Sequence, residues 1–169
     1  MTTLDDIDLK ILELLNEDGR LSHAAIGKEI GMTGPSVYAR VQRLERDGII
    51  QKYSAHLSAE KMGLGLTAFI RVNMQSTPDE DLIFEQFVRS DPRILECHEV
   101  DGEATYWLKV QTGSARDLRH LITALRRLPG SVYTTTNISL GTIKEQQTTV
   151  ALYRKIHGQP EESDADRSW

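Results

Sequence analysis

The first part of the chain carries apolar side chains at the spacing of helices. Residues 5–18 place an apolar side chain every three or four positions, which is the periodicity of a helix with one buried face. Aspartates at the start of this segment suit the positive end of the helix dipole, and Gly19 ends it. Residues 22–31 start with a serine, a favoured N-cap, and end with a glycine. We therefore predict two short helices.

A third helix is predicted directly after the glycine at position 31. Thr33 or Gly34 can cap it, Pro35 suits its first turn, and Gly48 ends it. Three apolar residues at i, i+4 and i+7 form its inward stripe, namely Val37, Val41 and Leu44. At about 100° per residue, the outer side carries Ser36, Tyr38, Ala39, Gln42, Arg43 and Arg46, with Arg40 on the flank.

This order of elements is typical of a helix-turn-helix DNA reader. A helix, a short helix and a tight turn at a glycine precede a helix whose outer side is small, polar and basic. Residues 49–58 then alternate in character, which predicts a strand or small wing against the helices. Periodicity alone also fits an ordinary three-helix bundle whose third helix has a solvated face.

Beyond a connection that contains two glycines, the pattern changes to strands and helices in alternation. Strand patterns occupy residues 66–75, 93–102, 104–113 and 131–145. Helix patterns occupy residues 77–91, with Ile83, Phe87 and Val88 expected inside, and residues 114–130. The resulting order, βαββαβ, is that of a ferredoxin-like domain.

We therefore predict an α+β chain, with a winged helix-turn-helix domain followed by a ferredoxin-like βαββαβ domain. The expected boundaries are residues 1–57 for the first domain, 58–66 for a linker, 67–150 for the second domain and 151–169 for a polar C-terminal tail. In a ferredoxin-like domain both helices cover one face of the sheet. The simplest cover for the other face is a second copy of the chain, which predicts a homodimer.

The charge distribution restricts DNA contact to a small part of the surface. The formal net charge is −5, and phosphate affinity comes from Lys and Arg replacing condensed counterions. Residues 33–53 nevertheless hold four basic and two acidic side chains, whereas the preceding 32 residues hold three basic and seven acidic ones. Arginines suit guanine edges, Gln42 suits adenine, and Ser36 and Thr33 suit phosphates or bases. We therefore expect the third helix to bind double-stranded DNA.

Enzymatic and metal-binding functions find little support. The five histidines are scattered without metal-ligand spacing, and a single cysteine, Cys97, excludes both a thiolate zinc site and an internal disulfide. We expect Cys97 to be a buried apolar filler. We predict no enzyme activity, no metal and no cofactor. The acidic N-terminus and the lack of a long apolar run predict a cytoplasmic protein that does not associate with membranes.

Over residues 4–145 the chain resembles the family of the leucine-responsive regulatory protein and AsnC, the feast/famine regulators. The landmarks are LDDIDLKILELLNEDGR, LSHAAIGKEIGMTGPSVYARVQRLERDGIIQKY, VDGEATYWLKV and TTTNISLGTIKE. The most specific of these landmarks is the spacing of apolar residues, arginines and a glycine over residues 37–50. The resemblance implies a transcription regulator that forms dimers, which in this family often gather into octamers, and that binds an effector amino acid near subunit interfaces.

The resemblance also assigns sites. It implies DNA contacts at Ser36, Tyr38, Arg40, Gln42, Arg43 and Arg46. It implies effector contacts at Gly102, Glu103, Ala104, Thr105, Tyr106, Thr134, Thr135, Thr136 and Asn137.

One departure from the family concerns the effector hairpin. Many amino-acid-binding members carry an aspartate where this chain has Thr105, a neutral hydroxyl. A charge-assisted hydrogen bond to an ammonium group is about twice as strong as a neutral one, so amino-acid binding should be weaker here. Either Glu103 or another acid takes over, or the ligand differs. An architectural DNA-binding protein without an effector is the alternative.

Overall fold

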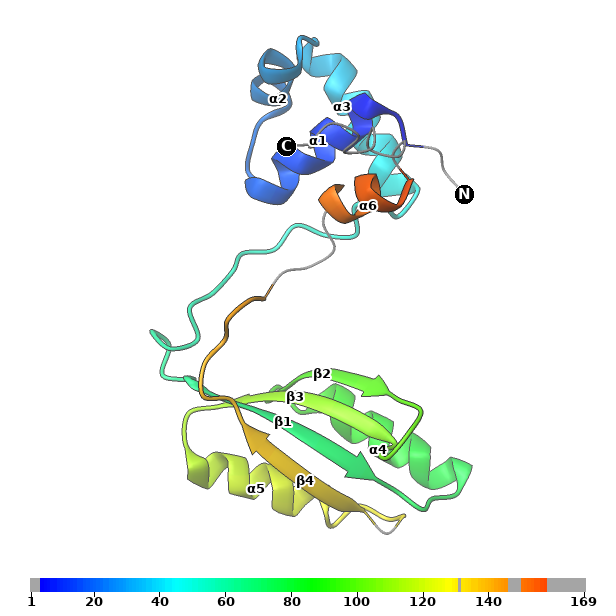
Figure 1. Ribbon diagram of the computed structural model, residues 1–169, viewed down its shortest axis with the longest axis vertical. Helices are drawn as coiled ribbons and strands as arrows, with labels where there is room; N and C mark the ends of the chain where they lie inside the picture. Colours follow the sequence, from blue (N-terminus) through cyan, green and yellow to red (C-terminus); the bar gives the residue numbers. More distant parts are fainter. Residues whose placement is uncertain (1–3, 131, 146–149, 158–169) are drawn as a thin grey trace, which may run out of the picture. The chain divides into compact units, whose positions relative to one another are not determined.

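The protein consists of two compact units, which the computed structural model describes over residues 4–130, 132–145 and 150–157 (Figure 1). The first unit combines residues 1–56 with residues 144–169, and the second comprises residues 57–143.

The first unit is built around three helices, as the sequence predicts. These are α1 (Asp6–Glu17), α2 (His23–Ile30) and α3 (Gly34–Arg46). One apolar cluster joins them, with its fully buried members being Ile11, Ile26, Val37, Val41 and Leu44. The last three are the inward stripe expected for α3. Thr33 caps that helix, because its side chain accepts a hydrogen bond from the amide of Ser36 at 3.3 Å.

The turn between α2 and α3 depends on two glycines. Gly31 ends α2 in the left-handed conformation, with φ of 72°, which favours glycine. Gly27 lies under the returning chain, and a Cβ there would come within 2.4 Å of the carbonyl oxygen of Met32. The close approach of the two backbone segments sets where α3 begins.

Residues 49–58 form no strand, so the predicted wing is wrong. A strand pattern yields a strand only where a neighbouring strand supplies hydrogen bonds, and no described strand belongs to the first unit. The segment is tied to α3 instead, because the hydroxyl of Tyr53 donates to Glu45 at 3.0 Å.

The expected C-terminal tail also contains structure. Residues Val150–His157 form a helix, α6, which belongs to the first unit. Arg154 fastens it to α1 by contacts with Glu13 at 2.9 Å and Asp6 at 3.5 Å. The rest of the predicted tail, residues 158–169, lies outside the described residues.

The second unit has the predicted βαββαβ order. Its elements are β1 (Leu66–Asn73), α4 (Pro78–Ser90), β2 (Ile94–Glu99), β3 (Tyr106–Thr112), α5 (Ala115–Leu125) and β4 (Tyr133–Ile138). The antiparallel sheet has the order β2-β3-β1-β4, and both helices lie on one of its faces (Figure 1). β4 is shorter than predicted, and Ser131 lies outside the described residues.

The core of this unit lies between the sheet and the two helices. Alternate residues of β1 and β3 are buried there against one side of each helix. Phe84 of α4 stacks on Tyr106 of β3 with ring centroids 4.6 Å apart. Ile83, which was expected inside, is exposed. Residues 82–84 are all apolar, so the sequence does not show which of them faces the sheet. In the structure it is Phe84, one helical turn before Val88.

Candidate functional site

The outer side of α3 presents a row of polar and aromatic side chains to solvent. Tyr38 is 51% exposed, and the side chain of Arg46 is 74% exposed. Thr33, Ser36 and Gln42 are exposed as well. These five residues, which we call the outer row, come from the set that the sequence predicts for DNA contact.

Neighbouring groups orient the outer row. The hydroxyls of Thr33 and Ser36 lie 2.8 Å apart and share a hydrogen bond. Gln42 donates to Glu45 at 3.0 Å, one turn further along the helix. The rings of Tyr38 and of His23, the first residue of α2, form a T-shaped pair with centroids 5.3 Å apart. Hydrogen-bond donors, acceptors and an aromatic ring are therefore held along one helix face.

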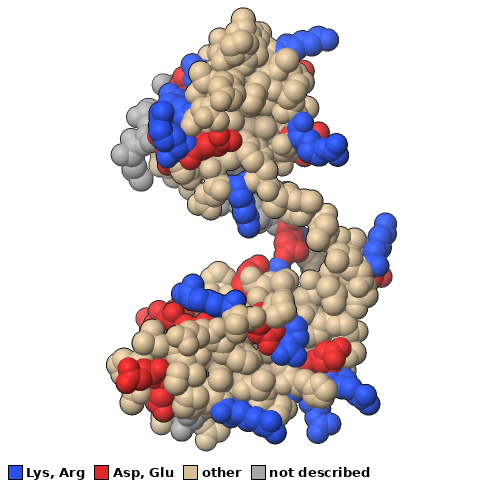
Figure 2. All heavy atoms as spheres, turned by 180° about the vertical axis from the view of Figure 1, so that it is seen from behind, with Lys and Arg blue, Asp and Glu red and all other residues tan. Residues whose placement is uncertain are grey.

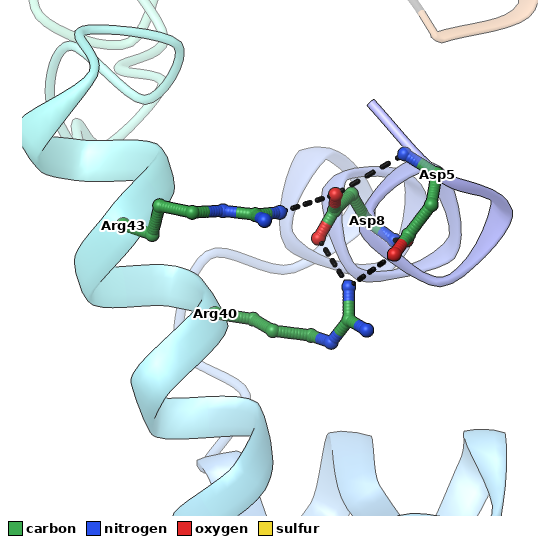
Figure 3. A network of polar contacts seen from close by, with 4 residues as sticks. All are labelled: Asp5, Asp8, Arg40 and Arg43. Atoms are coloured by element: carbon green, nitrogen blue, oxygen red, sulfur yellow. Dashed lines mark hydrogen bonds and ion pairs between the residues drawn. The ribbon is translucent and has the colours of Figure 1, made fainter. Parts of the chain in front are cut away.

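Arg40 and Arg43, which belong to the same predicted set, point toward α1 (Figure 3). Arg40 Nη1 contacts Asp5 Oδ2 at 2.7 Å and Asp8 Oδ1 at 2.8 Å. Arg43 Nη2 pairs with the other oxygen of Asp8. The side chains of Arg40 and Arg43 are only 26% and 36% exposed, and Nε of Arg43 is buried without a hydrogen-bond partner among the described residues. Both guanidinium groups thus have partners inside the first unit.

These ion pairs shift the titration of the groups that form them. The hydrogen bond from Arg40 holds the pKa of the Asp5 carboxyl below its ordinary value. The same contact, followed by that with Asp8, raises the pKa of Arg40. Figure 2 shows the wider distribution of charge, with Lys and Arg beside Asp and Glu in both units on the face that it draws.

The two segments predicted for an effector lie at the same end of the sheet. Tyr106 at the start of β3 and Thr134 in β4 both pair with Val72, near the end of β1. The loop that contains Gly102, with φ of 136°, precedes β3. The fold therefore brings residues 102–106, at the start of β3 and in the loop before it, and residues 134–137 of β4 to the two sides of β1.

Several of these side chains already have structural partners. Tyr106 is buried against Phe84, and this burial raises the pKa of its phenol. Thr105 accepts a hydrogen bond from the amide of Met74 at 3.2 Å. Arg126 donates to the hydroxyl of Thr134 at 2.8 Å. Ala104 is buried, and Thr136 faces the helices, as its register partner Ile70 does.

Of the remaining predicted effector residues, Glu103 and Asn137 border hollows on the open face of the sheet, and Gly102 and Thr135 line neither hollow. Glu103 is almost fully exposed, while Thr135 and Asn137 pair with Arg71 and Phe69, which lie on that face. One hollow of about 260 Å³ includes Phe69, Arg71, Trp107 and Asn137 in its lining. A second of about 380 Å³ is lined by Arg71, Val100, Asp101, Glu103, Ala104 and Trp107.

Arg71 is a functional candidate that the sequence reasoning missed. It borders both hollows, contacts Glu103 at 3.5 Å, and has a buried Nε without a partner among the described residues. Its signal in the sequence is a single charge inside the apolar strand LTAFIRVN. Alternation along that strand puts it on the face opposite Ile70 and Val72.

Cys97, which was expected to be buried, lies exposed on β2, an edge strand. Desolvation by its neighbours raises the pKa of its thiol. Among the described residues, no group of three or more His, Cys, Asp and Glu side chains could hold a metal ion. None of the described helices is both long enough and apolar enough to cross a lipid bilayer.

Comparison with known proteins identifies the family. The family model of the AsnC-type helix-turn-helix domain matches residues 4–45, and that of the Lrp/AsnC ligand binding domain matches residues 67–149. The HTH-type transcriptional regulator LrpB of Bacillus subtilis is 39% identical over 122 residues, which cover 72% of this chain and 80% of that protein. The leucine-responsive regulatory protein of Escherichia coli is 36% identical over 156 residues, 89% of this chain and 93% of its own length.

A solved structure supports the same assignment. A transcriptional regulator of Neisseria meningitidis in complex with L-Met has a TM-score of 0.81 and 33% identity, and the match covers 85% of this chain and 94% of that one. Both halves of the protein thus match the same family in sequence and in fold. The chain therefore belongs to the Lrp/AsnC family of transcription regulators, with an N-terminal helix-turn-helix DNA-binding domain and a C-terminal ligand-binding domain.

Proposed function

We propose that the protein binds double-stranded DNA sequence-specifically in the cytoplasm, through the outer row of α3. The observation that carries this proposal is the division of that helix into two sides. Val37, Val41 and Leu44 are buried in the unit, while the outer row stays exposed and oriented by its neighbours. A helix that is anchored along one side and polar along the other suits the major groove, which admits one α-helix.

Each member of the outer row has a role that follows from its chemistry. Arg46 suits the two acceptors of a guanine edge, and Gln42 suits adenine. The ring of Tyr38 offers apolar contact to a thymine methyl group. Thr33 and Ser36 lie at the N-terminus of the helix, where hydroxyls and backbone amides favour a phosphate. Each good bidentate base contact discriminates by about 1–3 kcal/mol.

We further propose that the protein acts as a homodimer formed through the open faces of two sheets. Phe69, Trp107 and Tyr133 are 43%, 51% and 73% exposed on that face, which no described helix of the second unit covers. A second copy would bury these rings and present two copies of α3 to DNA. Gathering of such dimers into octamers is a further step of the same proposal.

The ligand of the second unit is proposed to be an amino acid or a related small molecule. Support comes from the matched ligand-binding domain and from the related regulator whose structure contains L-Met. Glu103 and Arg71 offer a carboxylate and a guanidinium group next to one hollow, which complement the ammonium and carboxylate groups of an amino acid. The competing proposal is a protein without an effector, because Thr105 has no charge and already binds Met74.

DNA binding can be tested with two arginines of similar exposure. Arg46→Ala should weaken binding of a duplex recovered from a random pool by the unchanged protein, in gel-shift titrations at fixed salt. The matched control is Arg89→Ala, whose side chain is 78% exposed on α4 of the second unit. Equal affinity of the Arg46 and Arg89 variants would contradict the assignment of α3.

Effector binding can be tested by thermal shift. Any amino acid that occupies the proposed site should raise the unfolding temperature, by an amount that grows with its concentration. Glu103→Gln should reduce this shift, whereas Glu60→Gln, at an exposed position outside the hollows, should leave it unchanged. If no amino acid stabilises the unchanged protein, the proposal without an effector is favoured.

A further inference from the structure

The carboxylates that hold Arg40 and Arg43 are themselves fixed to α1. Asp5 is the N-cap of that helix, and its side chain accepts from the amide of Asp8 at 2.8 Å. The Asp8 side chain accepts in return from the amide of Asp5 at 3.2 Å. This capping box sets the position of both carboxylates relative to the backbone of α1. Two acidic groups one turn apart on α1 thus face two arginines one turn apart on α3 (Figure 3).

Asp8 differs from Asp5 in its burial. The Asp5 side chain is 51% exposed, whereas that of Asp8 is completely buried and both of its oxygens are occupied. A buried carboxylate that loses its cationic partners is strongly unfavourable. An arginine that left Asp8 for a DNA phosphate would therefore gain one ion pair and leave a buried charge with less compensation.

We propose that Asp8 is a positioning residue for DNA reading, which holds α3 at a fixed rotation against α1 and keeps Arg40 and Arg43 off the DNA. The outer row then faces the groove, with Arg46 as its cation. This inference rests on the proposed DNA binding by α3. Under this proposal the four charged side chains of the cluster act inside the first unit, because the two negative charges of the aspartates balance the two positive charges of the arginines.

The dependence of binding on salt separates this role from direct contact. Each DNA phosphate that a protein cation neutralises contributes about 0.9 to the slope of log affinity against log salt. Arginines that are held by a buried carboxylate release no counterions from DNA, whereas Arg46 is 74% exposed and contacts the neighbouring Asp47 at 3.7 Å, a longer pair that solvent screens. Removing Arg43 should therefore leave the slope unchanged. Removing Arg46 should lower the slope, because an exposed cation in the groove lies near DNA phosphates.

The first experiment measures these slopes on two duplexes, one recovered from a random pool by the unchanged protein and one of scrambled sequence. Arg43→Gln is expected to keep the slope on both duplexes and to lose part of the preference for the recovered one. Arg46→Gln is expected to lower the slope by up to about 0.9. Arg89→Gln, on α4, is the control for a lost surface charge and should change neither quantity.

The second experiment tests the positioning itself by a pair of substitutions. Asp8→Asn removes the acidic partner of Arg43, whereas Arg40 keeps Asp5, so affinity for the scrambled duplex should rise through the released Arg43. The preference for the recovered duplex should fall, by about tenfold if the coupling is of ordinary size. Asp8→Asn combined with Arg43→Gln removes the released charge as well, and the preference should recover toward that of the unchanged protein. A role in stability alone would change the affinity for both duplexes by the same factor and would leave the preference unchanged in both variants.

Two results would overturn the inference. One is a slope for Arg43→Gln that falls by about 0.9, as expected of a phosphate contact. The other is a double variant that prefers the recovered duplex less than Asp8→Asn does, as expected if Arg43 reads a base. Should Asp8→Asn fail to fold, as judged by helical circular dichroism, the slopes of Arg43→Gln and Arg40→Gln still decide the question. An unchanged protein that binds neither duplex would contradict the proposed DNA binding instead.

Discussion

Replacing Gly27 by alanine tests the packing that places the proposed reading helix. In an ordinary helix interior this change stabilises by about 1 kcal/mol, because glycine has the greater freedom to lose on folding. Here the new Cβ would lie 2.4 Å from the Met32 carbonyl oxygen and 3.3 Å from the carbonyl carbon of Thr33. The first distance is a full ångström below ordinary contact, and both neighbours are backbone atoms of the turn that leads into α3.

The turn has little freedom to move away. The amide of Met32 donates to the carbonyl of Gly27 at 2.7 Å, and Thr33 caps α3. Overpacking of a well-packed site costs about 1–3 kcal/mol, which exceeds the usual gain of the substitution. We therefore expect Gly27→Ala to destabilise the first unit by about 1–2 kcal/mol, and to weaken DNA binding by displacing α3.

Gly34→Ala provides the matched control. Its Cβ would meet Ala24 at 3.4 Å or more, which is ordinary contact, so its effect should lie between neutral and about 1 kcal/mol of stabilisation. Urea unfolding followed by helical circular dichroism measures both variants. Amide hydrogen exchange of the α2–α3 peptides assigns the change to the first unit, since two units need not unfold together. A Gly27 variant as stable as the Gly34 variant would refute the reasoning.

Three further predictions concern stability and titration. Phe84→Ala should destabilise the second unit by about 3–5 kcal/mol, because the ring is fully buried. Leu82→Ala, at a 56% exposed position, should cost much less. Unfolding of both variants can be followed by Trp107 fluorescence in a Trp169→Phe background. Burial, with the hydrogen bond to Glu45, raises the pKa of Tyr53 to about 12. Ultraviolet titration should therefore show Tyr53 ionising late, as the buried Tyr106 also does, and Tyr53→Phe should remove one of these late phenols. The contribution of Tyr53 to stability is full below pH 10 and is lost as the pH rises through about 12. Arg40 depresses the pKa of Asp5, so the contribution of this pair to stability is present above the ordinary value of 3.8 and is lost as the pH falls further. Asp5→Asn should therefore reduce the loss of urea-unfolding stability at acid pH. An unchanged acid dependence would exclude the pair as its cause.

Local patterns made most of the fold predictable. The signals for α3 lie within fifteen residues of one another, so no distant contact was needed to recognise the helix. They are the cap at Thr33, the proline in the first turn and the periodic apolar residues. The βαββαβ order followed in the same way from alternation, caps and turns. The predicted wing failed because alternation along residues 49–58 does not reveal whether a partner strand exists.

The partners of Arg40 and Arg43 could not be read from periodicity. The aspartates of α1 looked like residues that favour the start of a helix, and they do form a capping box. The same carboxylates also face α3 across more than thirty residues of sequence, which only the packing of the two helices determines. Arg71 was missed for a related reason, because the importance of one charge in a strand depends on which neighbours line the open face.

The most direct test of the whole account is selection of duplexes from a random pool by the unchanged protein, followed by the same selection with Gln42→Ala. We predict a two-fold-symmetric consensus with half-sites about one helical turn apart, because a dimer presents two copies of α3. The Gln42 variant should lose the base preference at one position in each half-site and keep the rest. Enrichment of no sequence, or a consensus that the Gln42 variant selects unchanged, would contradict sequence reading by the outer row of this helix.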